Sequence, residues 1–164
     1  MRSSLKFITM TSEDWMREAI RLSIENVKQG GGPFGAVIVK DNQLVATGTN
    51  RVVPHNDPTA HAEICAIRNA CEKLGTFDLS GCEIYSSCEP CPMCLSAIYW
   101  AHIDKLYFAN TKDDAKDIDF DDSMIYEELA RPQAERKLPV VTLLRDEALV
   151  AFKNWQEKTD KTPY

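Results

Sequence analysis

The sequence lacks any long hydrophobic run. No stretch approaches the roughly 20 apolar residues that a membrane helix needs, and residues 1–10 contain neither an apolar segment nor a small-residue cleavage site. We therefore expect no membrane association and no secretory signal. Internal repeats, low-complexity tracts and inter-domain linkers are also missing from the sequence. These absences favour a single domain over residues 1–164 that acts in the cytoplasm.

An excess of basic residues is missing as well. Lysine and arginine total 19 against 25 aspartates and glutamates, which gives a net charge of −6 at pH 7. Because contacts to phosphates need clustered lysine and arginine side chains, this balance argues against a nucleic-acid partner. Hydrophobic residues make up 44% and charged residues 27% of the 164 positions, which is typical of an ordinary globular protein.

Cysteine, in contrast, is plentiful. An even number of cysteines can indicate a disulfide framework, but a chain of this length does not need one to build a core. Crowding of cysteines into a short segment is more typical of metal or redox chemistry, and three of them fall within residues 88–94. The other three are expected to be small buried thiols. The six cysteines are Cys65, Cys71, Cys82, Cys88, Cys91 and Cys94.

Helical and strand-like patterns alternate along the chain. Thr11 or Ser12 can cap the first helix, and Asp41-Asn42 suits a hairpin turn between the first two strands. This alternation favours an α/β fold with one central mixed sheet. The predicted helices cover about residues 11–29, 59–75, 92–101, 123–130 and 146–156, and the five predicted strands cover 33–39, 43–48, 82–86, 105–109 and 138–144, with a loop at 51–59 and an acidic stretch at 113–122.

Two short motifs carry metal-binding side chains, and each begins a predicted helix. They are His61-Ala62-Glu63 and Pro90-Cys91-Pro92-Met93-Cys94. Cysteines three positions apart at a helix N-terminus point to the same side, and the helix dipole favours their thiolate forms. With His61 they would neutralise Zn²⁺ and leave a fourth position open, which is typical of a catalytic zinc. The sequence thus predicts one zinc per chain, bound by His61, Cys91 and Cys94.

Glu63 follows the predicted ligand His61 by two positions. At that helical spacing it cannot easily share the metal, but it can take a proton from water activated there and pass it to a leaving group. Other interpretations stay open: His61 could be a core side chain, Glu63 could be solvated, and the two cysteines could form a redox pair. A structural zinc could instead recruit Cys88 as its fourth ligand.

The paired motifs resemble the signature of zinc-dependent nucleobase deaminases. Further stretches are similar to the small bacterial guanine deaminases over nearly the whole chain. The resemblance implies a three-layer α/β/α sandwich with a central mixed five-stranded sheet, cytidine deaminase-like, that converts guanine and water to xanthine and ammonia. The stretches that carry it are residues 32–39, 56–63, 87–94, 97–100 and 120–123 and the terminal Tyr164.

The same resemblance implies roles for five further residues. Asn50 is expected to hydrogen-bond the purine, since an amide offers both a donor and an acceptor. Asp122 is expected to be a second acid that assists proton delivery. Without the resemblance, the preferred interpretation of Asp122 is one solvated acid among several. Phe34 and Trp100 are expected as pocket walls, with core packing as the alternative. Tyr164 is expected to close the pocket, with a frayed chain end as the alternative.

The resemblance also implies a homodimer in which the segment of about residues 145–164 is exchanged between subunits. A tRNA adenosine deaminase is a rival interpretation, which the acidic composition disfavours, and a guanosine deaminase is another. The non-enzymatic alternative is a zinc-stabilised binding module without turnover, and the presence of Glu63 argues against it. The resemblance therefore favours a small-molecule purine as the substrate.

Overall fold

The structure is a computed structural model that describes residues 9–164. Residues up to Asp122 belong to one compact unit and Ser123–Tyr164 form a second one. The prediction that there is no secretory signal concerns residues 1–10, and most of these lie outside the described residues. Within the described part of the chain, no helix combines the length and apolar character that crossing a bilayer requires.

A four-stranded mixed sheet forms the centre of the first unit. Its strands are β1 (Gly35–Lys40), β2 (Gln43–Thr49), β3 (Cys82–Cys88) and β4 (Lys105–Asn110), in the order β2-β1-β3-β4. β1 runs antiparallel to both of its neighbours, whereas β3 and β4 are parallel. Asp41 and Asn42 adopt φ values of 49° and 56° between β1 and β2. This is the backbone of a tight hairpin turn and confirms the predicted hairpin.

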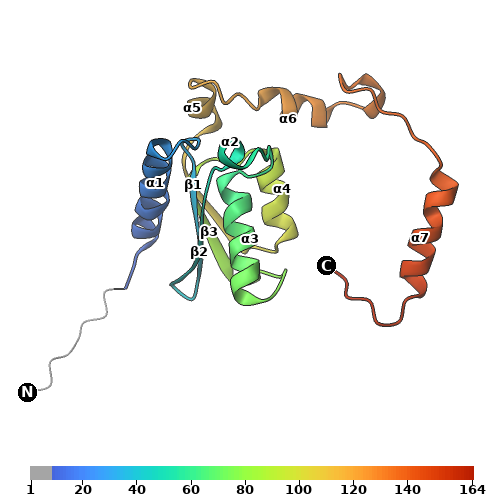
Figure 1. The fold of residues 1–164 in the computed structure, drawn as a ribbon, viewed down its shortest axis with the longest axis horizontal. Helices are drawn as coiled ribbons and strands as arrows, with labels where there is room; N and C mark the ends of the chain where they lie inside the picture. Colours follow the sequence, from blue (N-terminus) through green and yellow to red (C-terminus); the bar gives the residue numbers. More distant parts are fainter. Residues whose placement is uncertain (1–8) are drawn as a thin grey trace, which may run out of the picture. The chain divides into compact units, whose positions relative to one another are not determined.

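Helices cover both faces of this sheet (Figure 1). α1 (Ser12–Lys28) packs on one face, where Trp15 and Ala19 meet Val37, Val39 and Tyr85. α3 (Ala62–Leu74) and α4 (Pro92–Trp100) pack on the other face. Successive residues of a strand point to opposite faces of the sheet, so the side chains of β1 contribute to a separate hydrophobic core on each face. The three predicted layers are therefore present. The second core holds Ala36, Ile38, Ile84, Ala62, Ala66 and Ile98.

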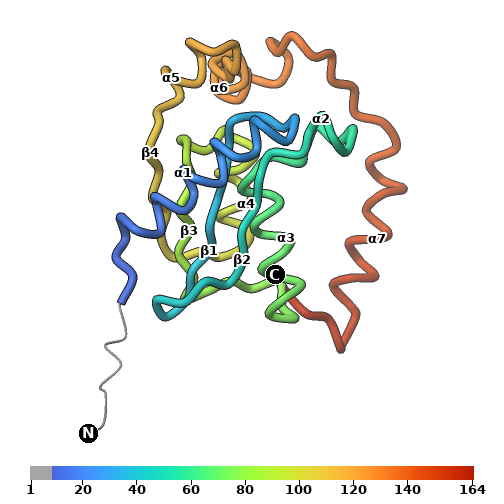
Figure 2. Tube along the Cα trace, turned by 60° about the vertical axis from the view of Figure 1, so that its left-hand side comes forward, coloured from blue at the N-terminus to red at the C-terminus, as the bar shows by residue number. Residues whose placement is uncertain are grey.

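Close packing of β2 against α3 depends on Gly48. A Cβ atom at this position would lie 2.2 Å from the carbonyl oxygen of Ala62 and 2.3 Å from the backbone nitrogen of Ala66. Only glycine therefore allows the strand and the helix to approach this closely. Because His61 and Glu63 lie at the first turn of α3, this contact also fixes their position over the sheet. Figure 2 shows β2 and α3 side by side in this unit.

Two short helices lie where the sequence predicted none. α2 (Val52–His55) falls within the expected loop, and α5 (Lys112–Lys116) overlaps the start of the acidic stretch. α5 begins with a capping box, in which the side chains of Thr111 and Asp114 satisfy each other's backbone N–H groups. Such caps stabilise even a single helical turn.

The second unit contains α6 (Ser123–Ala130), a 3₁₀ turn (Gln133–Glu135) and α7 (Arg145–Glu157). The prediction of a fifth strand at residues 138–144 is wrong, because this segment has no strand assignment. Its apolar side chains are largely exposed, with Val141 at 76% and Leu143 at 77%. An alternating apolar pattern forms a strand only where a neighbouring strand supplies hydrogen-bond partners. Within residues 9–164 the sheet accordingly has four strands rather than five.

Candidate active site

One end of the sheet gathers Asn50, Glu63 and the three predicted zinc ligands. The start of β1 pairs with the end of β2 through Gly35 and Thr49, and Ala36 pairs with Ser86 near the end of β3. The parallel pairing of Cys88 with Asn110 brings the end of β4 to the same place. The connections that leave these strand ends carry Asn50 and the cysteine motif. The antiparallel and parallel pairings together therefore explain why residues distant in sequence meet here.

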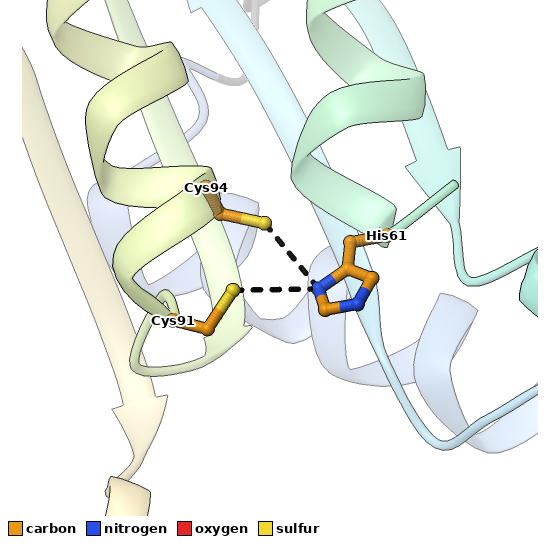
Figure 3. A group of neighbouring side chains, drawn as sticks. All are labelled: His61, Cys91 and Cys94. Carbon is orange, nitrogen blue, oxygen red and sulfur yellow. Dashed lines mark hydrogen bonds between the residues drawn. The ribbon is translucent and has the colours of Figure 1, made fainter. Parts of the chain in front are cut away.

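His61, Cys91 and Cys94 converge from the N-termini of two helices (Figure 3). His61 and Cys91 are the N-cap residues of α3 and α4, and Cys94 lies one turn into α4. The Nδ1 atom of His61 lies 3.5 Å from the Sγ atoms of both Cys91 and Cys94. For tetrahedral zinc with ordinary bond lengths, a nitrogen and a sulfur ligand are about 3.6 Å apart. The donor set and its spacing therefore fit zinc.

The electrostatics of this triad favour metal binding. The hydrogen bond from Cys94, with a further contribution from His61, lowers the pKa of Cys91 to about 4 despite its partial burial. The same hydrogen bond and burial raise the pKa of Cys94, so that this thiol keeps its proton at neutral pH. The contact with Cys91 raises the pKa of His61. One thiolate is thus already formed, and a metal ion would displace the proton from the second.

Cys88 lies apart from the triad. Its thiol donates a hydrogen bond to the carbonyl oxygen of Thr111 at 3.6 Å, and burial raises its pKa to about 11. Among the described residues, the group that could hold a metal ion comprises His61, Cys91 and Cys94, without Cys88. All six cysteines, which lie within residues 9–164, are free. Of the three cysteines predicted to be buried thiols, Cys82 is buried, whereas Cys65 and Cys71 are only partly buried.

Glu63 is almost completely buried in the first turn of α3, with 6% of its surface exposed. Desolvation of the carboxylate raises the pKa of Glu63. The hydroxyl of Ser86, on β3, donates a hydrogen bond of 3.1 Å to its Oε1 atom. A buried carboxyl with a raised pKa is suited to accept a proton and release it again near neutral pH. Its surroundings contradict the alternative of a solvated helix residue.

Asn50 is also buried, and Asn26 of α1 holds the backbone around it. The Nδ2 atom of Asn26, a side chain only 1% exposed, donates to the carbonyl oxygens of Gly32 and Asn50 at 2.8 and 2.9 Å. Its Oδ1 atom accepts from Nη1 of Arg51 at 3.3 Å. The Asn50 side chain accepts a hydrogen bond from the Val52 N–H. Asn26 therefore fixes the segment from which the Asn50 amide projects.

Phe34 and Asp122 lie in the same unit as the triad. Phe34 packs partly against the core and partly against Phe120, in an edge-to-face contact with ring centroids 5.0 Å apart. Burial, followed by the charge of Cys91, raises the pKa of Asp122. The electrostatic influence of Cys91 on Asp122 links this carboxyl to the metal-binding triad. The contacts of Phe34 fit the alternative of core packing, and its role as a pocket wall stays a prediction.

Trp100 and Tyr164 differ from the other predicted site residues in their exposure. Trp100 is the last residue of α4 and is 65% exposed. Tyr164 ends the second unit and is 74% exposed. Two supporting residues were not predicted from the sequence, Asn26 on α1 and Ser86 on β3, whose polar side chains are buried. An Asn in the last turns of an amphipathic helix and adjacent serines in a buried strand are the signals that could have found them.

Comparison with known proteins identifies the family. The model of the cytidine and deoxycytidylate deaminase zinc-binding region matches residues 9–110. The guanine deaminase of Bacillus subtilis is 47% identical over 94% of this chain and 100% of its own length. Its crystal structure superimposes with a TM-score of 0.92 and covers 94% of this chain and 99% of that one.

Two further relatives extend the comparison. A guanine deaminase structure from Nitrosomonas europaea is 36% identical, with a TM-score of 0.67, over 88% of this chain and 84% of that one. A tRNA-specific adenosine deaminase of Aquifex aeolicus is 40% identical over 61% of this chain and 66% of its own length. The relatives from Bacillus subtilis and Nitrosomonas europaea, which match this chain over most of its length, are guanine deaminases. The chain therefore belongs to the cytidine and deoxycytidylate deaminase family and has a cytidine deaminase-like fold.

Proposed function

We propose that this protein is a guanine deaminase, which converts guanine and water to xanthine and ammonia. The observation that carries the proposal is the 47% identity to the Bacillus subtilis guanine deaminase over 100% of that protein. The convergence of His61, Cys91 and Cys94 beside a buried Glu63 supports the same reaction. An enzyme of this specificity belongs to purine catabolism or salvage, and we propose that it acts in the cytoplasm.

One zinc ion per chain is proposed at the triad of His61, Cys91 and Cys94. Two thiolates and a neutral imidazole balance the charge of Zn²⁺, and three protein ligands leave one coordination position for water. When bound, zinc supplies a Lewis acid that brings the pKa of water close to 7. The positions of His61 and Cys91 at two helix N-termini favour this assembly, because the helix dipoles stabilise negative charge there.

The proton transfers are assigned to Glu63. Its buried carboxylate takes a proton from the attacking water and delivers it to the purine or to the departing amino group of C2. Ser86 donates to one carboxylate oxygen, and the proton transfer is assigned to the other one. Asp122 is assigned as a second acid, which assists as ammonia leaves. The raised pKa of Asp122 makes it a better proton donor near neutral pH than an ordinary aspartate.

Recognition of the base is assigned to Asn50, Phe34 and Trp100. The Asn50 amide can pair with the lactam edge of guanine, which presents both a donor and an acceptor. Phe34 offers an aromatic surface stiffened by its contact with Phe120. Trp100 is proposed as a second wall. Its large exposed surface is suited to contact with a ligand or with another subunit.

Two rival substrates have less support. The tRNA-specific adenosine deaminase of Aquifex aeolicus matches only 61% of this chain, and a net charge of −6 does not suit a folded RNA. A guanosine deaminase would need room for a ribose, which a closed pocket would deny. A binding module without turnover gives no reason for a carboxyl buried beside the triad, since desolvation of that group is costly.

The second unit, Ser123–Tyr164, is proposed to exchange between the subunits of a homodimer, with Tyr164 over the partner's site. Neither α6 nor α7 buries any residue, and apolar side chains such as Phe152 are exposed to 74%. Exposed apolar surface of this extent marks an interaction site. An exchanged segment would cover these side chains and would exclude water from the partner's purine pocket.

The test is ammonia release by the purified zinc-loaded protein. Guanine, guanosine, cytosine and a tRNA are offered separately, and each product is measured. We expect ammonia and xanthine from guanine only. Ammonia from guanosine or the tRNA at a higher kcat/KM than from guanine would contradict the substrate assignment, and absence of turnover with every substrate would contradict the enzymatic function.

A further inference from the structure

A cavity lies on the first unit, beside the segments that carry the metal-binding triad. It has a volume of about 450 Å³ and is formed by the end of β2, the α2 segment and the first turns of α3. None of His61, Cys91 and Cys94 lines it. Cavities of this size hold small-molecule ligands. The proposed deamination makes no use of it.

Cationic and hydrogen-bonding side chains surround this cavity. Its lining includes the guanidinium-bearing residues Arg51 and Arg68, the imidazole of His55 and the amide of Asn69, against one carboxylate, Asp57. Asp57 already accepts two hydrogen bonds from Thr59, at 2.8 and 2.7 Å, which lower its pKa. In a chain with a net charge of −6, a cavity with two arginines and one acid is a local exception that favours an anion.

The two arginines have donors to spare for a ligand. Arg68 contacts Asp57 at 3.5 Å and Thr59 at 3.4 Å, with its side chain 60% exposed. An exposed pair at this distance contributes little stability, so Arg68 can turn toward a competing anion at small cost. The Arg51 side chain makes one long hydrogen bond, of 3.3 Å, to Asn26. Each guanidinium carries five N–H donors in a planar fork that matches the oxygens of a phosphate.

The walls of this cavity join the active site through the backbone. Arg51 follows Asn50 in the chain, and Ala60, which also lines the cavity, precedes the zinc ligand His61. The N–H of Arg51 donates to the carbonyl oxygen of Ala60 at 2.8 Å and ties the two wall segments together. Arg51 also contacts the Asn26 side chain that holds Asn50. An anion that draws Arg51 toward itself therefore acts on the purine-binding amide.

We propose that this cavity binds the phosphate group of a small anionic molecule, with Arg51 and Arg68 as its principal ligands. The volume exceeds what one phosphate ion fills, so a phosphate monoester with an attached polar group, such as a nucleoside monophosphate, is the preferred occupant. His55 and Asn69 would contact the rest of the molecule. Occupancy weakens guanine binding, because the same Arg51 fork supports the Asn26–Asn50 network.

The test measures binding of two probes to the zinc-loaded full chain at constant ionic strength. The probes are inorganic phosphate and uridine 5′-monophosphate. Because uracil has a lactam edge like that of guanine, the Arg68 variants distinguish binding in this cavity from competition at the active site. Calorimetry and the midpoint of thermal unfolding report binding, and the KM for guanine reports the coupling. The variants are Arg68→Gln and Arg68→Lys. Arg17→Gln is the matched control, because Arg17 is an exposed arginine on α1 whose ion pairs within residues 9–164 are with Glu13 and Asp14 of the same helix.

We expect both probes to bind the wild type, with the nucleotide binding more tightly. Arg68→Gln should weaken binding by about tenfold or more, the usual loss for a charge-assisted bidentate contact, and Arg68→Lys should restore it only in part. Guanine turnover without a probe should be unchanged in Arg68→Gln, and the probe-induced rise in KM should disappear. Equal affinity for the two probes would assign the cavity to free phosphate.

Binding that is the same in Arg68→Gln and in the wild type would overturn the proposal, as would no binding of either probe. An unaltered guanine KM in the presence of a bound probe would overturn the coupling through Arg51. These outcomes are separable from failure of the proposed deaminase activity, because calorimetry and unfolding detect the anion whether or not guanine is turned over.

Discussion

The hydroxyl of Ser86 donates a hydrogen bond of 3.1 Å to Oε1 of Glu63, and both side chains are buried. Ser86 belongs to β3 and Glu63 to the first turn of α3, so the contact ties the sheet to the helix at the centre of the site. A hydrogen bond donated to a carboxylate favours its charged form and lowers its pKa. Burial raises the pKa of Glu63, and Ser86 is one donor that favours its carboxylate form.

Replacement of Ser86 by alanine should slow catalysis without loss of metal. The remaining carboxylate loses one donor, so the pKa of Glu63 rises further. Because the general base must be deprotonated, the acidic limb of the pH profile of kcat/KM should move to higher pH. The expected fall in kcat is about tenfold, the equivalent of one charged hydrogen bond.

Two companion variants separate this effect from a general packing defect. Ser86→Thr keeps the hydroxyl and should restore the profile. Ser87→Ala removes the neighbouring buried hydroxyl, which accepts from the Gly35 N–H and does not contact Glu63. An acidic limb that stays in place in Ser86→Ala would show that this hydrogen bond does not tune the base.

Glu63→Gln should abolish most of the turnover while the protein stays folded. Glutamine keeps the size and a hydrogen-bonding head but cannot accept the proton of the attacking water. Loss of a general acid–base typically costs about 10²–10⁴ in rate. Zinc content and the circular dichroism spectrum should match the wild type, and ammonia release is the measurement. A variant that retains most of its kcat would identify another group as the base.

The parts of the site that follow local rules could be predicted from the sequence. Cys91 and Cys94 share one helical turn, and His61 and Glu63 share another, so their spacing alone indicates which side chains point the same way. The hairpin at Asp41 and Asn42 is equally local, because its φ values are those that such residues tolerate. These features needed no knowledge of distant contacts.

The supporting contacts could not be predicted in the same way. Ser86 is 23 residues from Glu63 in the chain, and Asn26 is 24 residues from Asn50, so only the finished fold brings each pair together. The apolar pattern at residues 138–144 fails for a related reason, because it describes a strand's side chains but not the partner that a strand requires. A strand requires both a suitable local pattern of side chains and a distant partner strand, and the sequence pattern shows only the first.

Cys91→Ala should lose zinc or bind it far more weakly. The substitution leaves two ligands, and two ligands cannot hold Zn²⁺ in a tetrahedral site at useful affinity. Metal analysis after dialysis is the measurement, with Cys71→Ala as a control that removes a thiol outside the triad. Full zinc retention by Cys91→Ala would contradict the ligand assignment.

Zinc affinity of the wild type should also fall as the pH falls. The raised pKa of Cys94 means that its thiol is protonated at neutral pH, and zinc must displace that proton. Each proton released on binding lowers the affinity by about tenfold per unit of decreasing pH. Competition with a chelator across a pH series measures the slope. A slope of zero would show that both thiols bind zinc without releasing a proton.

Asn26→Leu should weaken guanine binding more than it weakens chemistry. The substitution leaves the carbonyl oxygens of Gly32 and Asn50 without their donor, at a cost of about 1–3 kcal/mol in the free energy of unfolding for each buried group. The Asn50 segment loosens, so KM for guanine should rise while kcat changes less. Asn26→Asp, which keeps the shape, helps separate loss of the donor from loss of packing. An unchanged KM in a folded Asn26→Leu protein would contradict a positioning role.

Removal of the last three residues, Thr162, Pro163 and Tyr164, tests whether the chain end closes the pocket. If Tyr164 covers the purine of the partner subunit, its loss admits water and weakens the hydrogen bonds to the base, so guanine turnover should fall. The space that it vacates should allow a ribose, so the ratio of guanine to guanosine turnover should fall as well. Zinc content and the oligomeric state from sedimentation should be unaltered, since the triad and α7 are intact in the truncated chain. The single substitution Tyr164→Ala separates the aromatic ring from the length of the tail. If both shortened and substituted enzymes match the intact one on both substrates, the terminal residues do not contribute to substrate choice.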